Sequence, residues 1–149
     1  MKAWIAHEKG LDLIGDVPPG WTVEAYPGGD APMPSDPADV VFWNVPPLGG
    51  STVEMLEKLP AVRVVQLMSA GAERWVGGVR AGVTLCNARG VHDSSTAEWA
   101  ATAVLTSLRN FPAFVRAQAA GRWAFAPTDE VAGKRVLVVG AGAIGTALA

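Results

Sequence analysis

The chain has 149 residues, and its 12 lysines and arginines against 14 aspartates and glutamates give a net charge of −2. This charge excludes a nucleic-acid protein that works through a basic surface, because phosphate binding needs clustered positive charge. Half of the residues are apolar and 17% are charged, so the chain can build a hydrophobic core and intrinsic disorder is excluded.

The apolar stretches are too short to cross a membrane. The longest charge-free stretch of helical character, residues 99–108, is about half of the roughly 20 residues that span a bilayer. Glu8 and Lys9 bring charge too early for the apolar region of a signal peptide. The single cysteine, Cys86, cannot form an internal disulfide. We therefore expect a cytoplasmic protein with no membrane partner.

Short apolar runs in the first ninety residues predict an α/β sheet. The expected strands are residues 2–6, 22–26, 39–43, 62–68 and 83–86. Several are nearly continuous in Val, Ile, Phe or Leu, as strands covered on both faces should be, so the sheet is expected to be mostly parallel. Eight of the 11 prolines precede residue 50, so some crossovers are expected to be loops. Residues 52–59 are expected to form a short helix behind a capping box of Ser51 and Glu54.

After Asp93 the apolar period changes from 2 to 3.6, which predicts a long helix. One apolar stripe of this helix consists of Ala97, Ala100, Ala101, Val104, Leu105 and Leu108. Ser95 and Glu98 form a second expected capping box, and Asp93 is also placed to cap. Pro112 should kink or end the helix near Phe111, with a further helical piece up to Ala120. A turn at residues 132–134 and a buried strand at residues 135–139 are expected next.

The strongest chemical motif follows that strand. Residues 136–145 read VLVVGAGAIG and contain Gly140, Gly142, Ala143, Ile144 and Gly145. These glycines follow a predicted buried strand and precede a predicted helix, which is the context of the dinucleotide-binding fingerprint. Gly140 would make the tight turn, Gly142 would let the backbone approach a pyrophosphate, and Gly145 would let the helix pack closely on the strand. Free amides at the helix start would hold the phosphates.

The fingerprint lies close to the last residue of the sequence. A strand–helix–strand unit takes about 30 residues, and residues 133–149 supply 17 of them. The acidic residue that reads the ribose, about 20 positions beyond the glycines, would lie past Ala149. The sequence therefore predicts a truncated chain, in which residues 135–139 would lack neighbours and expose both faces.

A second motif, Met68-Ser69-Ala70-Gly71-Ala72-Glu73, directly follows the predicted strand 62–68. Small residues at the carboxyl end of a parallel strand can aim consecutive amides at an anion, in the crevice where open α/β sheets bind ligands. The other interpretation is an ordinary loop from strand to helix with no ligand. The residues alone favour this second interpretation.

The remaining reactive residues do not form a site. His92 and Asp93 are consecutive at a helix entrance and point apart, so an acid/base pair is not expected. His7 is expected on the surface or in a loop, and Cys86 in the core as an inert side chain. Two histidines and one cysteine at positions 7, 86 and 92 offer no zinc spacing, so no metal is expected.

Five of the six tryptophans fall into two groups by position. Trp4, Trp43 and Trp99 are expected in the core or an interface, and packing is also the default for Trp75 and Trp123. These last two lie near the presumed cleft and domain junction, where a substrate role is also open.

Taken in order and spacing, several segments resemble the front half of a D-isomer-specific 2-hydroxyacid dehydrogenase. They are VVQLMSAG at 64–71, VTLCNARG at 83–90, TAE at 96–98 with Leu108-Arg109, GRW at 121–123, and VAGK at 131–134 before the glycines. The resemblance covers residues 62–149, and residues 1–60 match only in general pattern.

This resemblance implies a flavodoxin-like parallel-sheet substrate domain, residues 1–92, followed by the start of a Rossmann dinucleotide-binding domain, residues 93–149. It implies that the Ala70 and Gly71 amides hold a substrate carboxylate and that Asn44 faces the substrate cleft. It also places Thr96 near the nicotinamide of NAD or NADP, and the helix from Ala97 to Leu108 in a homodimer interface.

The resemblance implies an oxidoreductase that transfers hydride between NAD(P) and a small 2-hydroxy or 2-keto acid. The family's catalytic arginine, glutamate and histidine all follow the glycine fingerprint, so residues 1–149 alone are expected to be inactive. Two other functions stay open. One is a dinucleotide-sensing binding protein or corepressor on the same fold, and the other is a flavodoxin-like module that mainly dimerises.

Overall fold

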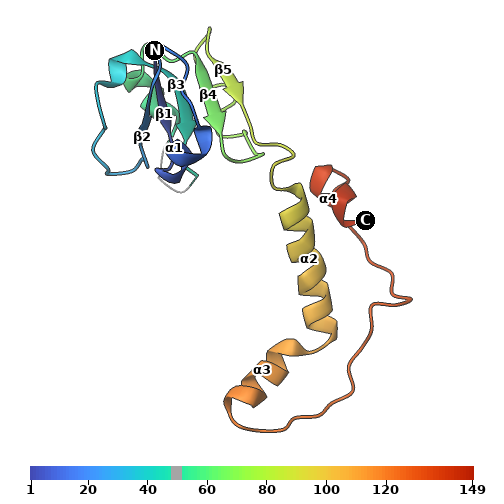
Figure 1. Ribbon diagram of the computed structural model, residues 1–149. Coiled ribbons are helices and arrows are strands. Elements are labelled where there is room, and N and C mark those ends of the chain that lie inside the picture. Colours follow the sequence, from blue (N-terminus) through green and yellow to red (C-terminus); the bar gives the residue numbers. More distant parts are fainter. Residues whose placement is uncertain (48–51) are drawn as a thin grey trace. The chain divides into compact units, whose positions relative to one another are not determined.

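The computed structural model describes residues 1–47 and 52–149, and Figure 1 shows its elements in chain order. Contacts between residues divide the chain into two compact units, Met1–Arg89 and Gly90–Ala149. The predicted capping residue Ser51 lies outside the described residues.

A five-stranded parallel sheet organises the first unit. Its strands occur in the order β2-β1-β3-β4-β5, and every neighbouring pair is parallel. This is the flavodoxin-like order of a doubly wound sheet, which confirms the predicted α/β class. The elements of this unit are β1 (Lys2–Ile5), α1 (Lys9–Ile14), β2 (Thr22–Ala25), η1 (Pro37–Asp39), β3 (Val40–Val45), η2 (Val53–Lys58), β4 (Val64–Leu67) and β5 (Thr84–Cys86).

The five strands predicted in the first ninety residues are all present, with ends that differ by one or two residues. The helix expected at residues 52–59 is a 3₁₀ helix, η2, and its preceding residue Thr52 makes no side-chain capping bond. Helix α1 has no counterpart among the sequence predictions. It is only six residues long and buries none of them, so it carries little of the apolar periodicity that reveals a helix.

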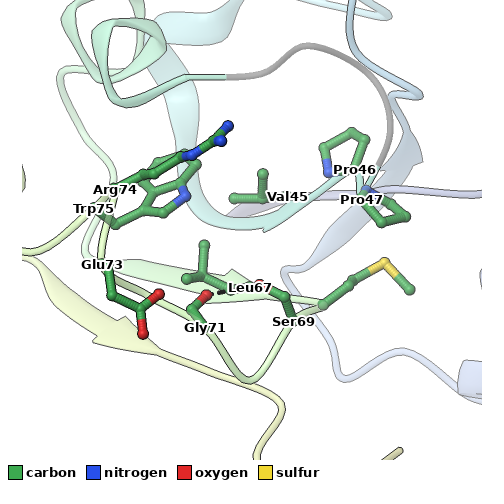
Figure 2. Close-up of a pocket in the computed structure, with 10 residues that line it drawn as sticks. Val45, Pro46, Pro47, Leu67, Ser69, Gly71, Glu73, Arg74 and Trp75 are labelled. Carbon is green, nitrogen blue, oxygen red and sulfur yellow. Dashed lines mark hydrogen bonds between the residues drawn. The ribbon is translucent and has the colours of Figure 1, made fainter. Parts of the chain in front are cut away.

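Large apolar side chains fill the core of the first unit. Trp4, Trp43, Val65 and Leu67 are all fully buried, and burial of one such side chain stabilises the fold by about 1.5–3 kcal/mol. Trp43 meets Trp75 edge to face, with ring centroids 5.7 Å apart. Trp75 lies over the carboxyl ends of β3 and β4, where Figure 2 draws it beside Val45 and Leu67.

Arg80 ties the region before β4 together. Its guanidinium donates to the carbonyl oxygens of Leu56 at 2.8 Å, Leu59 at 2.6 Å and Pro60 at 2.9 Å. These carbonyls lie in and after η2, and those of Leu56 and Leu59 also accept from Leu59 N and Val62 N. One side chain therefore links several carbonyl groups of the turn that leads into β4.

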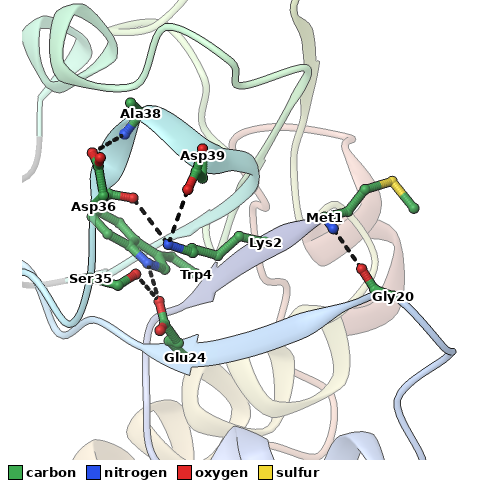
Figure 3. Close-up of polar contacts among 9 residues, drawn as sticks. All are labelled: Met1, Lys2, Trp4, Gly20, Glu24, Ser35, Asp36, Ala38 and Asp39. Carbon is green, nitrogen blue, oxygen red and sulfur yellow. Dashed lines mark hydrogen bonds and ion pairs between the residues drawn. The ribbon is translucent and has the colours of Figure 1, made fainter.

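A group of polar contacts holds β2 to the start of β1 (Figure 3). Trp4 Nε1 donates to Glu24 Oε2 at 2.9 Å, and the Ser35 hydroxyl donates to the same oxygen. Burial raises the pKa of Glu24, but the hydrogen bonds from Ser35 and Trp4 and the charge of Lys2 lower it, and the net shift is downward. The ionised form of Glu24 is thus favoured by the fold.

The second unit contains three helices, α2 (Asp93–Leu108), α3 (Phe111–Ala119) and α4 (Ala143–Leu148). The long helix, its end near Phe111 and the further helical piece are as predicted. Asn110 adopts a left-handed conformation between α2 and α3, with φ of 53°, and Pro112 lies in the first turn of α3, where proline is tolerated. The predicted turn closes through Lys134 N, which donates to Val131 O.

The capping predictions for α2 are wrong. The helix begins at Asp93, so Ser95 and Glu98 lie inside it and Asp93 is its first residue rather than its cap. The Ser95 hydroxyl donates backward to the His92 carbonyl at 3.1 Å. Ser95 competes for this local acceptor instead of capping an amide.

Residues 135–139 do not form the predicted buried strand. They have no regular structure, and Leu137 is 86% exposed. A β-strand needs a neighbour that pairs with its backbone, and residues 90–149, all of which the structure describes, contain no other strand. The apolar side chains of this segment are therefore exposed, as expected for a chain in which the strand lacks neighbours.

Among the described residues, no helix is long and apolar enough to cross a membrane.

Replacing Arg80 by methionine should lower the free energy of unfolding by about 1–2 kcal/mol, because the four carbonyl groups to which it donates lose a charged donor. Urea denaturation followed by circular dichroism would measure the change. Arg63→Met is the matched control, since no hydrogen bond from the Arg63 side chain is present among the described residues. Equal stability of the two variants would contradict the role of Arg80.

Glu24 should make stability depend on pH. Because its pKa is lower in the folded protein than the ordinary value of 4.5, its contribution is present above that value and is lost as the pH falls through the folded pKa. The stability difference between the parent and Glu24→Gln should therefore be largest near neutral pH and shrink in acid. Urea denaturation at several pH values, with the exposed Glu8→Gln as control, would show whether the difference instead stays constant.

Candidate functional site

The loop after β4 is fixed through its carbonyl groups. The Ser69 carbonyl accepts from Ala88 N at 2.9 Å, and the Ala70 carbonyl accepts from Asn87 Nδ2 at 2.8 Å. The Gly71 carbonyl accepts from the Ser69 hydroxyl at 2.8 Å. The loop is thus held to the residues that follow β5 and to itself.

Two amides of the same loop have no partner among the described residues. Within the part of the chain that the structure describes, neither Ala70 N nor Gly71 N donates a hydrogen bond. Two consecutive amides without partners, on a loop whose carbonyls are engaged, can bind an anion such as a carboxylate. The geometry therefore suits the anion-binding interpretation of residues 68–73.

A pocket of about 310 Å³ adjoins this loop at the carboxyl ends of β3 and β4. Figure 2 shows its apolar walls and two charged side chains, Glu73 and Arg74, on the turn after the loop. The lining residues are Val45, Pro46, Pro47, Leu67, Met68, Ser69, Gly71, Glu73, Arg74 and Trp75. Trp75, for which packing and a substrate role were both open, packs on the core and also lines this pocket.

Asn44 bridges three strands at the same edge of the sheet. Its Oδ1 accepts from Ala6 N at 3.2 Å, just after β1, and its Nδ2 donates to the Gln66 carbonyl at 3.2 Å on β4. Both ends of the side-chain amide are therefore engaged, and Asn44 is not among the residues that line the pocket. These bonds give Asn44 a structural role, and its predicted contact with substrate stays a prediction.

In the second unit the glycine turn has the backbone that its sequence predicts. Gly140 has a φ of 111°, which side chains rarely tolerate. A Cβ at Gly145 would lie 2.0 Å from the Gly140 carbonyl oxygen and 3.3 Å from Val138 Cγ1, whereas one at Gly142 would meet nothing within 4 Å. Glycine is thus required at Gly145 for close packing, and the space at Gly142 is open for another group.

Helix α4 starts directly after this turn and contacts α2. Figure 1 shows α4 beside the beginning of α2, and Thr96 belongs to the first turn of α2. The first amides of α4, including those of Ala143 and Ile144, have no acceptor within the helix. The fingerprint residues, which lie in the turn before α4 and at its start, are thus joined to a helix that packs against the helix of Thr96.

The other reactive residues lie apart from these two places. His7 is exposed and accepts from Lys9 N at 3.1 Å, as expected for a surface residue. Cys86 is only partly buried, so the expectation of a core position is met in part. No group of three metal-ligating side chains occurs within residues 1–47 and 52–149.

Sequence reasoning missed two residues beside the loop after β4. Asn87, which holds the loop from the end of β5, was noted only as part of a motif. Glu73 was noted only as the last residue of the motif at residues 68–73. Parallel strands end at one edge of a sheet, so an asparagine directly after β5 could have been placed beside the loop after β4.

The comparisons with known proteins agree with this geometry. Residues 101–149 match the family model described as D-isomer specific 2-hydroxyacid dehydrogenase, NAD binding domain. Glyoxylate/hydroxypyruvate reductase HPR3 of Arabidopsis thaliana is 32% identical over 104 residues, which cover 66% of this chain and 32% of that protein.

Solved structures extend the likeness along the chain. A D-isomer specific 2-hydroxyacid dehydrogenase of Xanthobacter autotrophicus, solved with NADPH and MES, is 25% identical with a TM-score of 0.63, and the match covers 99% of this chain and 49% of that one. A family protein of Aeromonas salmonicida subsp. salmonicida has a TM-score of 0.76 at 19% identity, with 99% and 48% covered, and shows the fold alone.

Fold and glycine turn together define an α/β chain whose second unit carries a dinucleotide-binding motif. The chain is related to the D-isomer-specific 2-hydroxyacid dehydrogenases, and the resemblance predicted from its motifs is confirmed. It spans about half the length of the solved relatives, 49% and 48%, and 32% of the plant reductase.

Proposed function

We propose that the protein is an NAD(P)-dependent 2-hydroxyacid dehydrogenase that acts on a small 2-hydroxy or 2-keto acid. The observation that carries the proposal is the glycine turn at residues 140–145, which lies inside the segment that matches the NAD-binding family model. The name of the plant relative, a glyoxylate/hydroxypyruvate reductase, supports a small 2-keto acid as substrate.

Each unit contributes one part of the proposed mechanism. Residues 1–92 form the substrate domain, in which the Ala70 and Gly71 amides hold the substrate carboxylate. Residues 93–149 begin the dinucleotide domain, in which amides at Gly142, Ala143, Ile144 and Gly145 hold the phosphates and Thr96 lies near the nicotinamide. A bound nicotinamide supplies or accepts the hydride, and the protein orients the two reactants.

The proton transfer of this reaction needs an acid/base group. In the proposed enzyme that group, its partner carboxylate and an arginine come from residues that follow the glycine fingerprint, as the family resemblance implies. No catalytic residue is therefore proposed among the residues of this chain.

The homodimer is also part of the proposal, through the helix from Ala97 to Leu108. In α2, Trp99 is 74% exposed and Leu105 is 47% exposed, which supports an interface on this helix. A cytoplasmic location is proposed because the single cysteine, Cys86, is unpaired.

Gly71→Pro tests whether the loop after β4 binds the substrate carboxylate. Proline removes one amide donor without breaking a bond within the described residues, so KM for pyruvate should rise about tenfold to a hundredfold while KM for the dinucleotide changes little. Gly71→Ala is the matched control, because it adds the same Cβ and keeps the amide. Equal effects of the two variants, or equal effects on both substrates, would assign the loop a structural role only.

Gly142→Val tests the dinucleotide site. A side chain at Gly142 meets nothing within 4 Å, so the fold should be kept while the space for a pyrophosphate is filled. Isothermal titration with NADH and NADPH should show an affinity at least tenfold weaker than in the parent protein. Ala147→Val, on the exposed side of α4, should bind as the parent does. Unchanged affinity in Gly142→Val would remove the glycine turn from the proposed function.

A further inference from the structure

Glu73 lies against the loop that carries the unpaired amides. A Cβ at Gly71 would lie 2.9 Å from Glu73 Oε2 and 3.8 Å from its Cδ. Figure 2 shows the Glu73 carboxylate beside Gly71, at the same side of the pocket as the loop. The carboxylate thus stands next to one of the two amides that would bind an anion.

The charge of Glu73 is not neutralised by a neighbour. Among the described residues it has neither an ion pair nor a hydrogen bond. In Figure 2 the side chain of Arg74, the other charged residue of the pocket, extends over Trp75 and away from the Glu73 carboxylate. A negative charge therefore remains beside the Gly71 amide, where it acts on any anion that binds there.

We propose that Glu73 is a specificity-determining residue of this loop, which weakens the binding of every carboxylate and selects 2-keto acids with one carboxylate over those with two. The inference rests on the proposed function, because it needs the loop to bind the carboxylate of the substrate. A ligand with two negative charges is repelled by Glu73 about twice as strongly, in free energy, as a ligand with one.

The proposal predicts how affinity changes with ligand charge. Glu73→Gln removes the charge and keeps the size of the side chain. It should strengthen the binding of pyruvate, a monoanion, about threefold, and that of 2-oxoglutarate, a dianion, about tenfold at low ionic strength. Both gains should shrink at about 0.5 M salt, because salt screens exposed charges.

Isothermal titration of the parent protein and Glu73→Gln with both acids would measure these changes. Glu57→Gln is the matched control. It removes the same charge from an exposed residue of η2, which precedes β4 and lies away from its carboxyl end. Equal gains for the two acids, a gain that salt does not reduce, or no gain would each overturn the proposal for Glu73.

Gly71→Pro separates this inference from the proposed function. If pyruvate binds the parent and Gly71→Pro abolishes binding, the loop is the anion site, and the response of Glu73→Gln alone decides the role of Glu73. If neither the parent nor Glu73→Gln binds either acid, both the loop assignment and the inference fail. If Gly71→Pro binds as the parent does, the proposed substrate loop fails, and the role of Glu73 fails with it.

Discussion

Parallel pairing of the strands is the constraint on which the first unit depends. Because β1, β3, β4 and β5 run in one direction, the residues that follow them all reach the same edge of the sheet. The unused amides, the pocket and the residues that hold the loop are collected there by topology alone. Ala6, Asn44, Ala70 and Asn87 are far apart in sequence, and hydrogen bonds join them in pairs at this edge.

The crevice of such a sheet is expected where the strand order reverses, between β1 and β3. In this chain the Asn44 side chain accepts from Ala6 N and so joins the ends of those two strands. The pocket opens one strand further along, between the ends of β3 and β4. The Asn44 side chain thus occupies the place where the strand order reverses, and the pocket lies beside it.

The parts of the fold that depend on local sequence could be predicted, and those that depend on distant partners could not. The strands of the first unit follow from continuous apolar runs, and the break between α2 and α3 follows from Pro112. Residues 135–139 have an equally apolar run, but their strand needs pairing partners that residues 90–149 do not supply. The capping box at Ser95 was also wrong, because several polar residues before the helix offer alternative starts and the sequence does not rank them. The glycine turn was predicted well because backbone sterics at Gly140 and Gly145 are local.

The tryptophan side chains of the two units differ in their exposure to water. Of the six tryptophans, Trp4, Trp43 and Trp75 are at most 9% exposed and Trp21 is partly exposed, all in the first unit, whereas Trp99 and Trp123 in the second unit are 74% and 93% exposed. Indoles in an apolar core emit at shorter wavelength than indoles in water, and dissolved quenchers reach only the exposed ones. The emission of this protein therefore contains a blue, protected component from the buried indoles of the first unit and a red, quenchable component to which both indoles of the second unit contribute. The core of the first unit can therefore be followed through the protected component without adding a label.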